Sequence, residues 1–141
     1  MNWKKINQQA LKYFQDYLQL DTSNPPGNEY LAAHYFDAIL KNEGIETQMF
    51  TTAPDRKILY AKIAGTNKKN GLMLSGHSDV VPVERDKWTT DPFGGQVIDN
   101  RIYGRGAIDM KSFTIMQFIA FLLIHQQEKP LNRDLIFCVT P

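Results

Sequence analysis

The sequence has almost no cysteine, which limits the chemistry it can carry. Its 141 residues contain one cysteine, Cys138, so no disulfide can form within the chain. Because Cys138 lies inside an apolar stretch typical of a strand, we expect a buried structural thiol rather than a nucleophile or a metal ligand. A chain without disulfides fits a reducing compartment, so we expect a cytoplasmic protein.

An excess of charge of either sign is also missing. Sixteen basic and fifteen acidic residues are well mixed and give a net charge of +1. This balance gives no electrostatic reason to expect nucleic acid or an anionic membrane as a partner. Lysines interrupt the apolar residues at the N-terminus, unlike in a secretory signal, and the most apolar stretch, residues 115–124, is too short to span a bilayer. We therefore expect neither nucleic acid nor membrane as a partner.

Repeats, low-complexity runs and linkers are absent as well, so we expect one domain over residues 1–141. Apolar residues recur at helical spacing over residues 2–20, which predicts a first helix. A second helix is predicted from Asn28, as its N-cap, to a stop at Gly44, with Glu29 favouring its positive end. Strands are predicted over residues 45–51, 57–64, 71–76 and 135–140, with a turn over residues 65–70 and a hairpin over residues 97–103.

A third helix is predicted from Asp109 to about residue 127. It is apolar nearly all round, so we expect protein to cover most of its sides. The positive end of its dipole would then favour the Asp109 carboxylate. The order of the elements predicts an α/β sandwich.

Two blocks carry residues typical of a metal site, residues 76–82 and 104–111. His77 and Asp79 follow a short apolar strand at i and i+2, so their side chains should share a face. A neutral imidazole suits Zn²⁺, and a carboxylate such as Asp79 can orient it. Asp109 has two oxygens that could bridge a pair of cations. A bare His-x-Asp is weak support, because a strand-end histidine is more often a hydrogen-bonded structural residue.

The residues around these blocks point to one family. Residues 72–82, Trp88, residues 91–95 and residues 102–111 closely resemble the M20 metallopeptidase family, which includes acetylornithine deacetylase, succinyl-diaminopimelate desuccinylase, aminoacylase-1 and glutamate carboxypeptidases. The ordered match extends over essentially the whole chain. Residues 24–29 resemble the loop after the first helix of these enzymes, and residues 134–141 resemble the strand that leads to their Glu-Glu pair.

The resemblance implies a fold and a partial active site. The implied fold is a three-layer αβα sandwich with a mixed sheet, the zinc-exopeptidase-like catalytic domain. Residues 1–141 would be its N-terminal portion, without the dimerisation or lid domain and the C-terminal part. His77 would bind one metal, Asp109 would bridge both metals, and Asp79 would stand behind His77 as a catalytic residue. The general-base Glu, the other acidic ligands and a distant His come later in the family.

The resemblance also implies cofactors and a reaction. A complete site would hold two Zn²⁺, with Co²⁺ or Mn²⁺ as alternatives. A metal-bridging water would attack the amide carbonyl of an N-acyl amino acid or a peptide. The full-length protein could form a homo-oligomer, while this chain by itself is expected to be inactive.

Two other readings stay open at this point. The chain could be a non-catalytic fragment or interaction module that keeps only the fold, or a mononuclear or structural domain, which the residues around Asp109 argue against. Trp88 and Phe93 are expected to pack their own loop more readily than to line a substrate entrance. Arg105 and Lys111 could bind a substrate carboxylate, pair with Asp109 or be solvated. Gly104 and Gly106 are expected to allow a tight turn, and His34 and His125 lack partners at ligand spacing.

Overall fold

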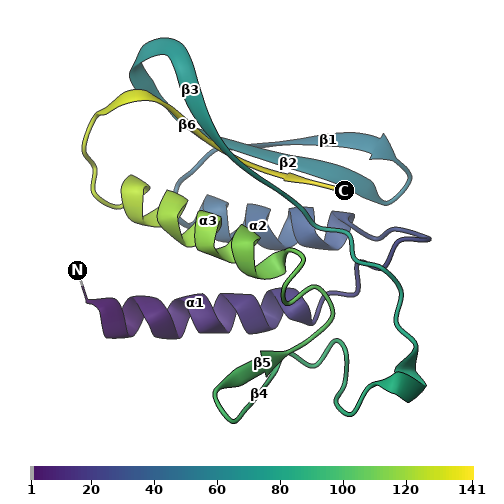
Figure 1. The fold of residues 1–141 in the computed structure, drawn as a ribbon. Coiled ribbons are helices and arrows are strands. Elements are labelled where there is room, and N and C mark those ends of the chain that lie inside the picture. Colours follow the sequence, from purple (N-terminus) through teal and green to yellow (C-terminus); the bar gives the residue numbers. More distant parts are fainter. Residues whose placement is uncertain (1) are drawn as a thin grey trace.

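Helices and a mixed sheet form separate layers of the molecule (Figure 1). The computed structural model describes residues 2–141, apart from the side chains of residues 68 and 69. The described helices are α1 (Trp3–Leu18), α2 (Tyr30–Asn42), α3 (Lys111–His125) and a short 3₁₀ turn, Arg85–Lys87; the strands are β1 (Thr47–Ala53), β2 (Arg56–Ile63), β3 (Gly65–His77), β4 (Gln96–Ile98), β5 (Arg101–Tyr103) and β6 (Leu131–Thr140). Within residues 2–141, no helix is both long and apolar enough to cross a membrane.

The main sheet has the strand order β1-β2-β6-β3. β6 runs antiparallel to β2 and parallel to β3, so the sheet is mixed. α2 and α3 lie along one face of it, and α1 lies beyond them (Figure 1). The predicted α/β fold with a mixed sheet is therefore confirmed, and the described residues supply the sheet and the helices on one of its faces.

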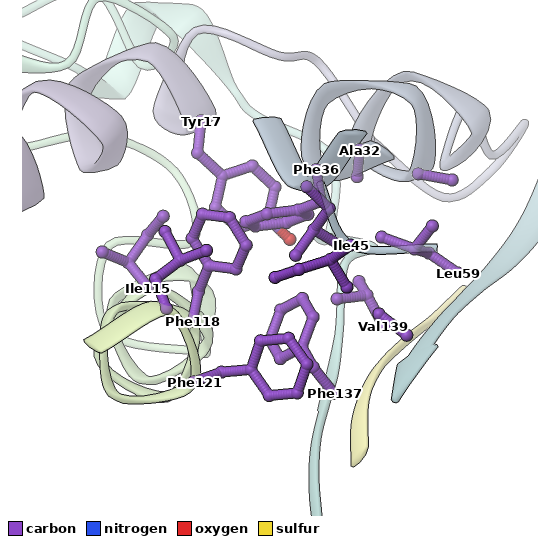
Figure 2. Packing of buried hydrophobic residues seen from close by; sticks show 14 of the residues in the cluster. Tyr17, Ala32, Phe36, Ile45, Leu59, Ile115, Phe118, Phe121, Phe137 and Val139 are labelled. Atoms are coloured by element: carbon purple, nitrogen blue, oxygen red, sulfur yellow. The ribbon is translucent and has the colours of Figure 1, made fainter. Parts of the chain in front are cut away.

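An aromatic cluster joins the three helices to the sheet (Figure 2). Phe36 of α2 lies with its ring centroid 4.9 Å from Tyr17 of α1, 4.8 Å from Phe118 of α3 and 5.4 Å from Phe137 of β6. All four side chains are fully buried, and the rings around Phe36 meet it edge to face, the arrangement that aromatic quadrupoles favour. This packing fixes where the end of α1 and the start of α3 lie relative to β3.

Two local predictions in the first half of the chain are wrong. Asn28 does not cap α2: the cap position is Glu29, which makes no capping hydrogen bond. The fully buried Glu29 side chain instead lies with one carboxylate oxygen 3.1 Å from the Arg56 guanidinium, and this tertiary ion pair sets the helix start at Tyr30.

Residues 65–70 do not form a turn between two strands. β3 runs through them, because Gly65 and Asn67 pair with Leu131 and Arg133 of β6 before the register shifts. A Cβ at Gly65 would lie 2.2 Å from the Arg133 carbonyl carbon. Only glycine therefore allows the two strand backbones to approach this closely.

The third helix also differs from its prediction. It begins at Lys111 with Met110 at the cap position, so Asp109 precedes the helix instead of opening it. Phe113 and Met116 are 54% and 56% exposed, so the described residues leave one side of this apolar helix uncovered. The other predictions near the site hold: β4 and β5 form the hairpin, with positive φ at Asp99 and Asn100, and Cys138 is buried.

Candidate metal centre

His77 is the last residue of β3, and its position is fixed from both sides. Next to it in the sheet, His77 pairs with Thr140 of the parallel strand β6. Toward the helices, Gly76 lies so close to α3 that a Cβ there would be 2.6 Å from Thr114 Oγ1. The buried Ser78 then bonds the Thr140 carbonyl through both its backbone N–H and its hydroxyl, at 2.8 Å each. The imidazole therefore projects from a constrained strand end.

The structure brings the three predicted site residues together. His77 Nδ1 lies 2.9 Å from Asp79 Oδ1, and His77 Nε2 lies 3.0 Å from Asp109 Oδ1. The Asp109 side chain is 85% exposed, whereas those of His77 and Asp79 are 36% and 30% exposed. One imidazole nitrogen thus faces a sheltered carboxylate, and the other faces an open one.

Electrostatics favour the protonated form of His77 in the absence of metal. Partial burial alone would lower the pKa of His77, but hydrogen bonds to Asp109 and Asp79 and the Asp79 charge outweigh it, so the net pKa is raised. The same negative charge would attract a metal cation, which binds the neutral imidazole and so competes with the proton.

A segment that the site prediction did not include supports this cluster. The chain after α1 lies parallel to the residues after β3: Val80 N–H donates to the Thr22 carbonyl, and Asn24 N–H donates to the Val80 carbonyl. The buried Thr22 hydroxyl donates to the Ser78 carbonyl at 2.6 Å. The Asn24 side-chain amide lies 3.3 Å from Asp79 Oδ2, so His77 and Asn24 hydrogen-bond to different oxygens of Asp79.

Lys111 anchors the segment that carries Asp109. Its side chain is fully buried and donates to the carbonyls of Tyr17 and Leu20, at 3.1 and 2.7 Å, near the end of α1. Burial lowers the pKa of Lys111 to about 7. Just before the helix, Gly106 has a φ of +83°, and a Cβ there would lie 2.7 Å from Val80, so the predicted tight turn is confirmed. Lys111 therefore fixes the start of α3, directly after Asp109.

The comparisons with known proteins agree with this arrangement. Residues 73–141 match the profile described as "Peptidase family M20/M25/M40". Over 107 residues the chain is 36% identical to acetylornithine deacetylase from Vibrio cholerae, covering 74% of this chain and 28% of that protein. The chain belongs to the M20 peptidase family. It spans less than a third of the length of the curated M20 relatives that it matches first.

Solved M20 structures show the same fold. An M20 metallo-carboxypeptidase from Sulfolobus solfataricus superposes with a TM-score of 0.77 at 23% identity, covering 93% of this chain and 30% of that one. A dinuclear metal binding peptidase of the M20 family from Bacillus subtilis gives a TM-score of 0.68 at 17% identity, covering 98% of this chain and 36% of that one. At these identities the likeness concerns the fold alone.

The remaining candidates from the sequence differ in how close they lie to the three-residue cluster, and Arg105 lines the same hollow as His77, Asp79 and Asp109. Neither Arg105 nor Lys111 makes an ion pair with Asp109 among the described side chains. His125 Nε2 lies 3.0 Å from the Glu43 carbonyl, and His34 packs against the Tyr30 ring. Trp88 packs under the Arg105 guanidinium and also lines a hollow beside Asp109, so it takes part in both roles considered from the sequence. Sequence reasoning missed Asn24 as a site residue because it is 55 positions from Asp79.

Proposed function

We propose that the whole protein is a metal-dependent hydrolase that cleaves the amide bond of an N-acyl amino acid or a peptide. The observation that supports this most is the cluster of His77, Asp79 and Asp109, held on two separate segments of an M20 fold. The M20 relatives include a deacetylase and a metallo-carboxypeptidase, both of which act on amide-type bonds by their names. In this proposal residues 1–141 form the N-terminal portion of a catalytic domain.

The residues present fit a metal ion. Two ligand atoms on one tetrahedral Zn²⁺, each bonded at about 2.0–2.2 Å, lie roughly 3.3 Å apart. His77 Nε2 and Asp109 Oδ1 already lie 3.0 Å apart, at a hollow of about 110 Å³ that Asp79 and Arg105 also line. Asp79 lies at Nδ1, on the other side of the imidazole from Asp109, so among the described residues no three His, Cys, Asp or Glu side chains could hold one ion. The chain thus offers two ligands of a larger site.

Each of the three residues has a distinct task in the proposal. His77 binds through Nε2, because Nδ1 is engaged by Asp79. Asp79 fixes the imidazole tautomer and strengthens His77 as a ligand. Asp109, whose exposed carboxylate lies before α3 and beside His77 Nε2, would contribute its oxygens to the metal pair. We propose Zn²⁺, with Co²⁺ or Mn²⁺ as alternatives, in a cytoplasmic enzyme that could assemble as a homo-oligomer.

When bound, a metal pair supplies a polarised carbonyl and a water whose pKa falls toward about 7. His77 at the end of β3 and Asp109 just before α3 would hold those ions. The proton-accepting Glu that the M20 resemblance implies belongs, in this proposal, to another part of the whole protein.

The test is a hydrolysis assay on the whole protein with N-acetyl amino acids, detecting the released amine. Activity should disappear after chelation and return with Zn²⁺, Co²⁺ or Mn²⁺. His77→Ala should abolish both metal retention and turnover, whereas His34→Ala, an exposed helical histidine, should change neither. Full turnover in chelator, or in His77→Ala, would overturn the proposal.

A further inference from the structure

A buried ion pair lies at the far end of the loop that supports Asp79. The Glu29 side chain is fully buried, and its Oε1 atom lies 3.1 Å from the guanidinium of Arg56, on β2. Among the described residues, neither Glu29 oxygen has a hydrogen-bond partner, and the buried Nε of Arg56 has none either. A buried ion pair with so few hydrogen bonds adds little stability, because the desolvation of both charges offsets their attraction. A role in positioning the chain accounts for it better.

The backbone of the loop packs directly on this pair. Gly27 has a φ of +90°, and a Cβ there would lie 3.0 and 3.2 Å from the two Glu29 oxygens and 3.3 Å from Arg56 Cδ. The Gly27 N–H donates to the Ser23 carbonyl at 2.9 Å, which closes a turn over residues 23–27. The position of this turn therefore depends on where the ion pair holds Gly27.

Asn24 lies inside the turn and joins it to the metal centre. Its backbone N–H donates to the Val80 carbonyl at 2.9 Å, and its side-chain amide lies 3.3 Å from Asp79 Oδ2. The side-chain distance is just beyond the usual N–H···O range, so a small displacement of the turn would break this contact. The other Asp79 oxygen lies 2.9 Å from His77 Nδ1. A continuous series of contacts thus leads from the ion pair, through the turn, to the imidazole.

We propose that Glu29 and Arg56 are positioning residues for the metal centre. Their ion pair sets the turn so that the Asn24 amide reaches Asp79, and Asp79 then orients the His77 ring. Neither member of the pair lines the hollows beside the metal centre, so its effect must pass through the turn. The inference rests on the proposed function in taking His77 as a metal ligand.

The test observes the side-chain NH₂ signals of Asn24 by NMR in the metal-free whole protein at one fixed pH. Their loss in Asn24→Ala assigns them. Glu29→Gln keeps the shape of the side chain and removes its charge, so the Asn24 signals should move toward those of an exposed asparagine. The affinity for Zn²⁺, measured by competition with a chelator, should fall about 3- to 10-fold, less than the roughly 10- to 100-fold expected for a direct partner of a ligand.

Asp37→Asn is the matched control. Asp37 is a second buried carboxylate of α2, and it accepts hydrogen bonds from Lys41 and Thr47, outside the loop. This variant should lower the midpoint of urea unfolding, as Glu29→Gln does, but leave the Asn24 signals and the Zn²⁺ affinity unchanged. Equal shifts of the Asn24 signals in both variants would overturn the inference, because they would show a general effect of lost stability.

Arg56→Lys tests the same step with a smaller change, and it decides the question if Glu29→Gln does not fold. It keeps a cation beside Glu29 but loses the planar guanidinium, so the Asn24 signals should shift in the same direction by a smaller amount. Asn24 signals that stay in place in the folded variants would overturn the inference. These signals are recorded without metal or substrate, so their outcome is separate from that of the hydrolysis assay.

Discussion

At the scale of single residues, Asp79 connects two parts of the chain that are far apart in sequence. One of its oxygens accepts from His77 Nδ1, and the other lies 3.3 Å from the Asn24 amide. Both neighbours present N–H groups, so a carboxylate that only accepts fits between them, and an amide in its place would turn its NH₂ toward one donor. The orientation of the His77 ring therefore depends on the loop after α1.

This arrangement predicts a loss of metal affinity in Asp79→Asn. We expect affinity in the whole protein to fall roughly 10- to 100-fold, since a carboxylate behind a ligating imidazole raises its basicity and fixes its ring. Competition with a coloured chelator measures the effect, and circular dichroism checks the fold. The double variant Asp79→Asn with Asn24→Asp restores an acceptor opposite the new amide and should recover part of the loss. Unchanged affinity in Asp79→Asn would contradict the assignment.

At the scale of elements, the contact between β3 and α3 depends on Gly76. A Cβ there would lie 2.6 Å from Thr114 Oγ1 and 3.3 Å from Met110 Cε, both at the start of the helix. Gly76→Ala should therefore destabilise the fold by about 1–3 kcal/mol, the usual cost of overpacking. Urea denaturation measures it, with Ser75→Ala at the neighbouring exposed position as the control.

A second substitution tests whether the cause is the steric contact. Thr114→Ala removes the atom that the new methyl group would meet, so Gly76→Ala should cost less in that background. If Gly76→Ala is neutral, β3 and α3 do not pack as tightly as the structure has them.

The elements themselves could be predicted where local pattern decides them. The helical periodicity before Leu18, the stop at Gly44 and the turn at Asp99 and Asn100 are local features, and each element lies where the sequence predicts it. The wrong boundaries depend on distant partners. Glu29 forms an ion pair with Arg56, and residues 65 and 67 pair with β6.

The same distinction holds for the site. His77 and Asp79 stand two positions apart at a strand end, so their contact could be predicted from strand geometry. The approach of Asp109 was expected only through the M20 resemblance, because 32 residues separate it from His77. Neither source identified Asn24, and the Lys111 anchor needed the packed ends of α1 and α3.

At the scale of the whole molecule, apolar surfaces remain uncovered by the described residues. Phe50 and Met73 are each 50% exposed on the sheet, and each follows or precedes a side chain that packs into the core. Since strand side chains alternate between faces, these two mark the face away from the helices. Phe113 and Met116 add an exposed side of α3. The all-round apolar pattern of this helix predicts that protein covers it, but the pattern does not identify which segment supplies the cover.

The 141-residue chain purified alone should accordingly bind Zn²⁺ weakly and hydrolyse no N-acetyl amino acid. His77 and Asp109 supply two protein ligands, whereas a catalytic zinc ion typically has three and a water. Proton transfer in hydrolysis also needs a positioned base, and the two carboxylates of the cluster are engaged with His77. Calorimetric titration with Zn²⁺, run beside the hydrolysis assay and with His77→Ala as the control, measures both properties. Tight stoichiometric binding with turnover would mean that a complete site forms within one chain or between two copies, and the two-ligand description would then be wrong.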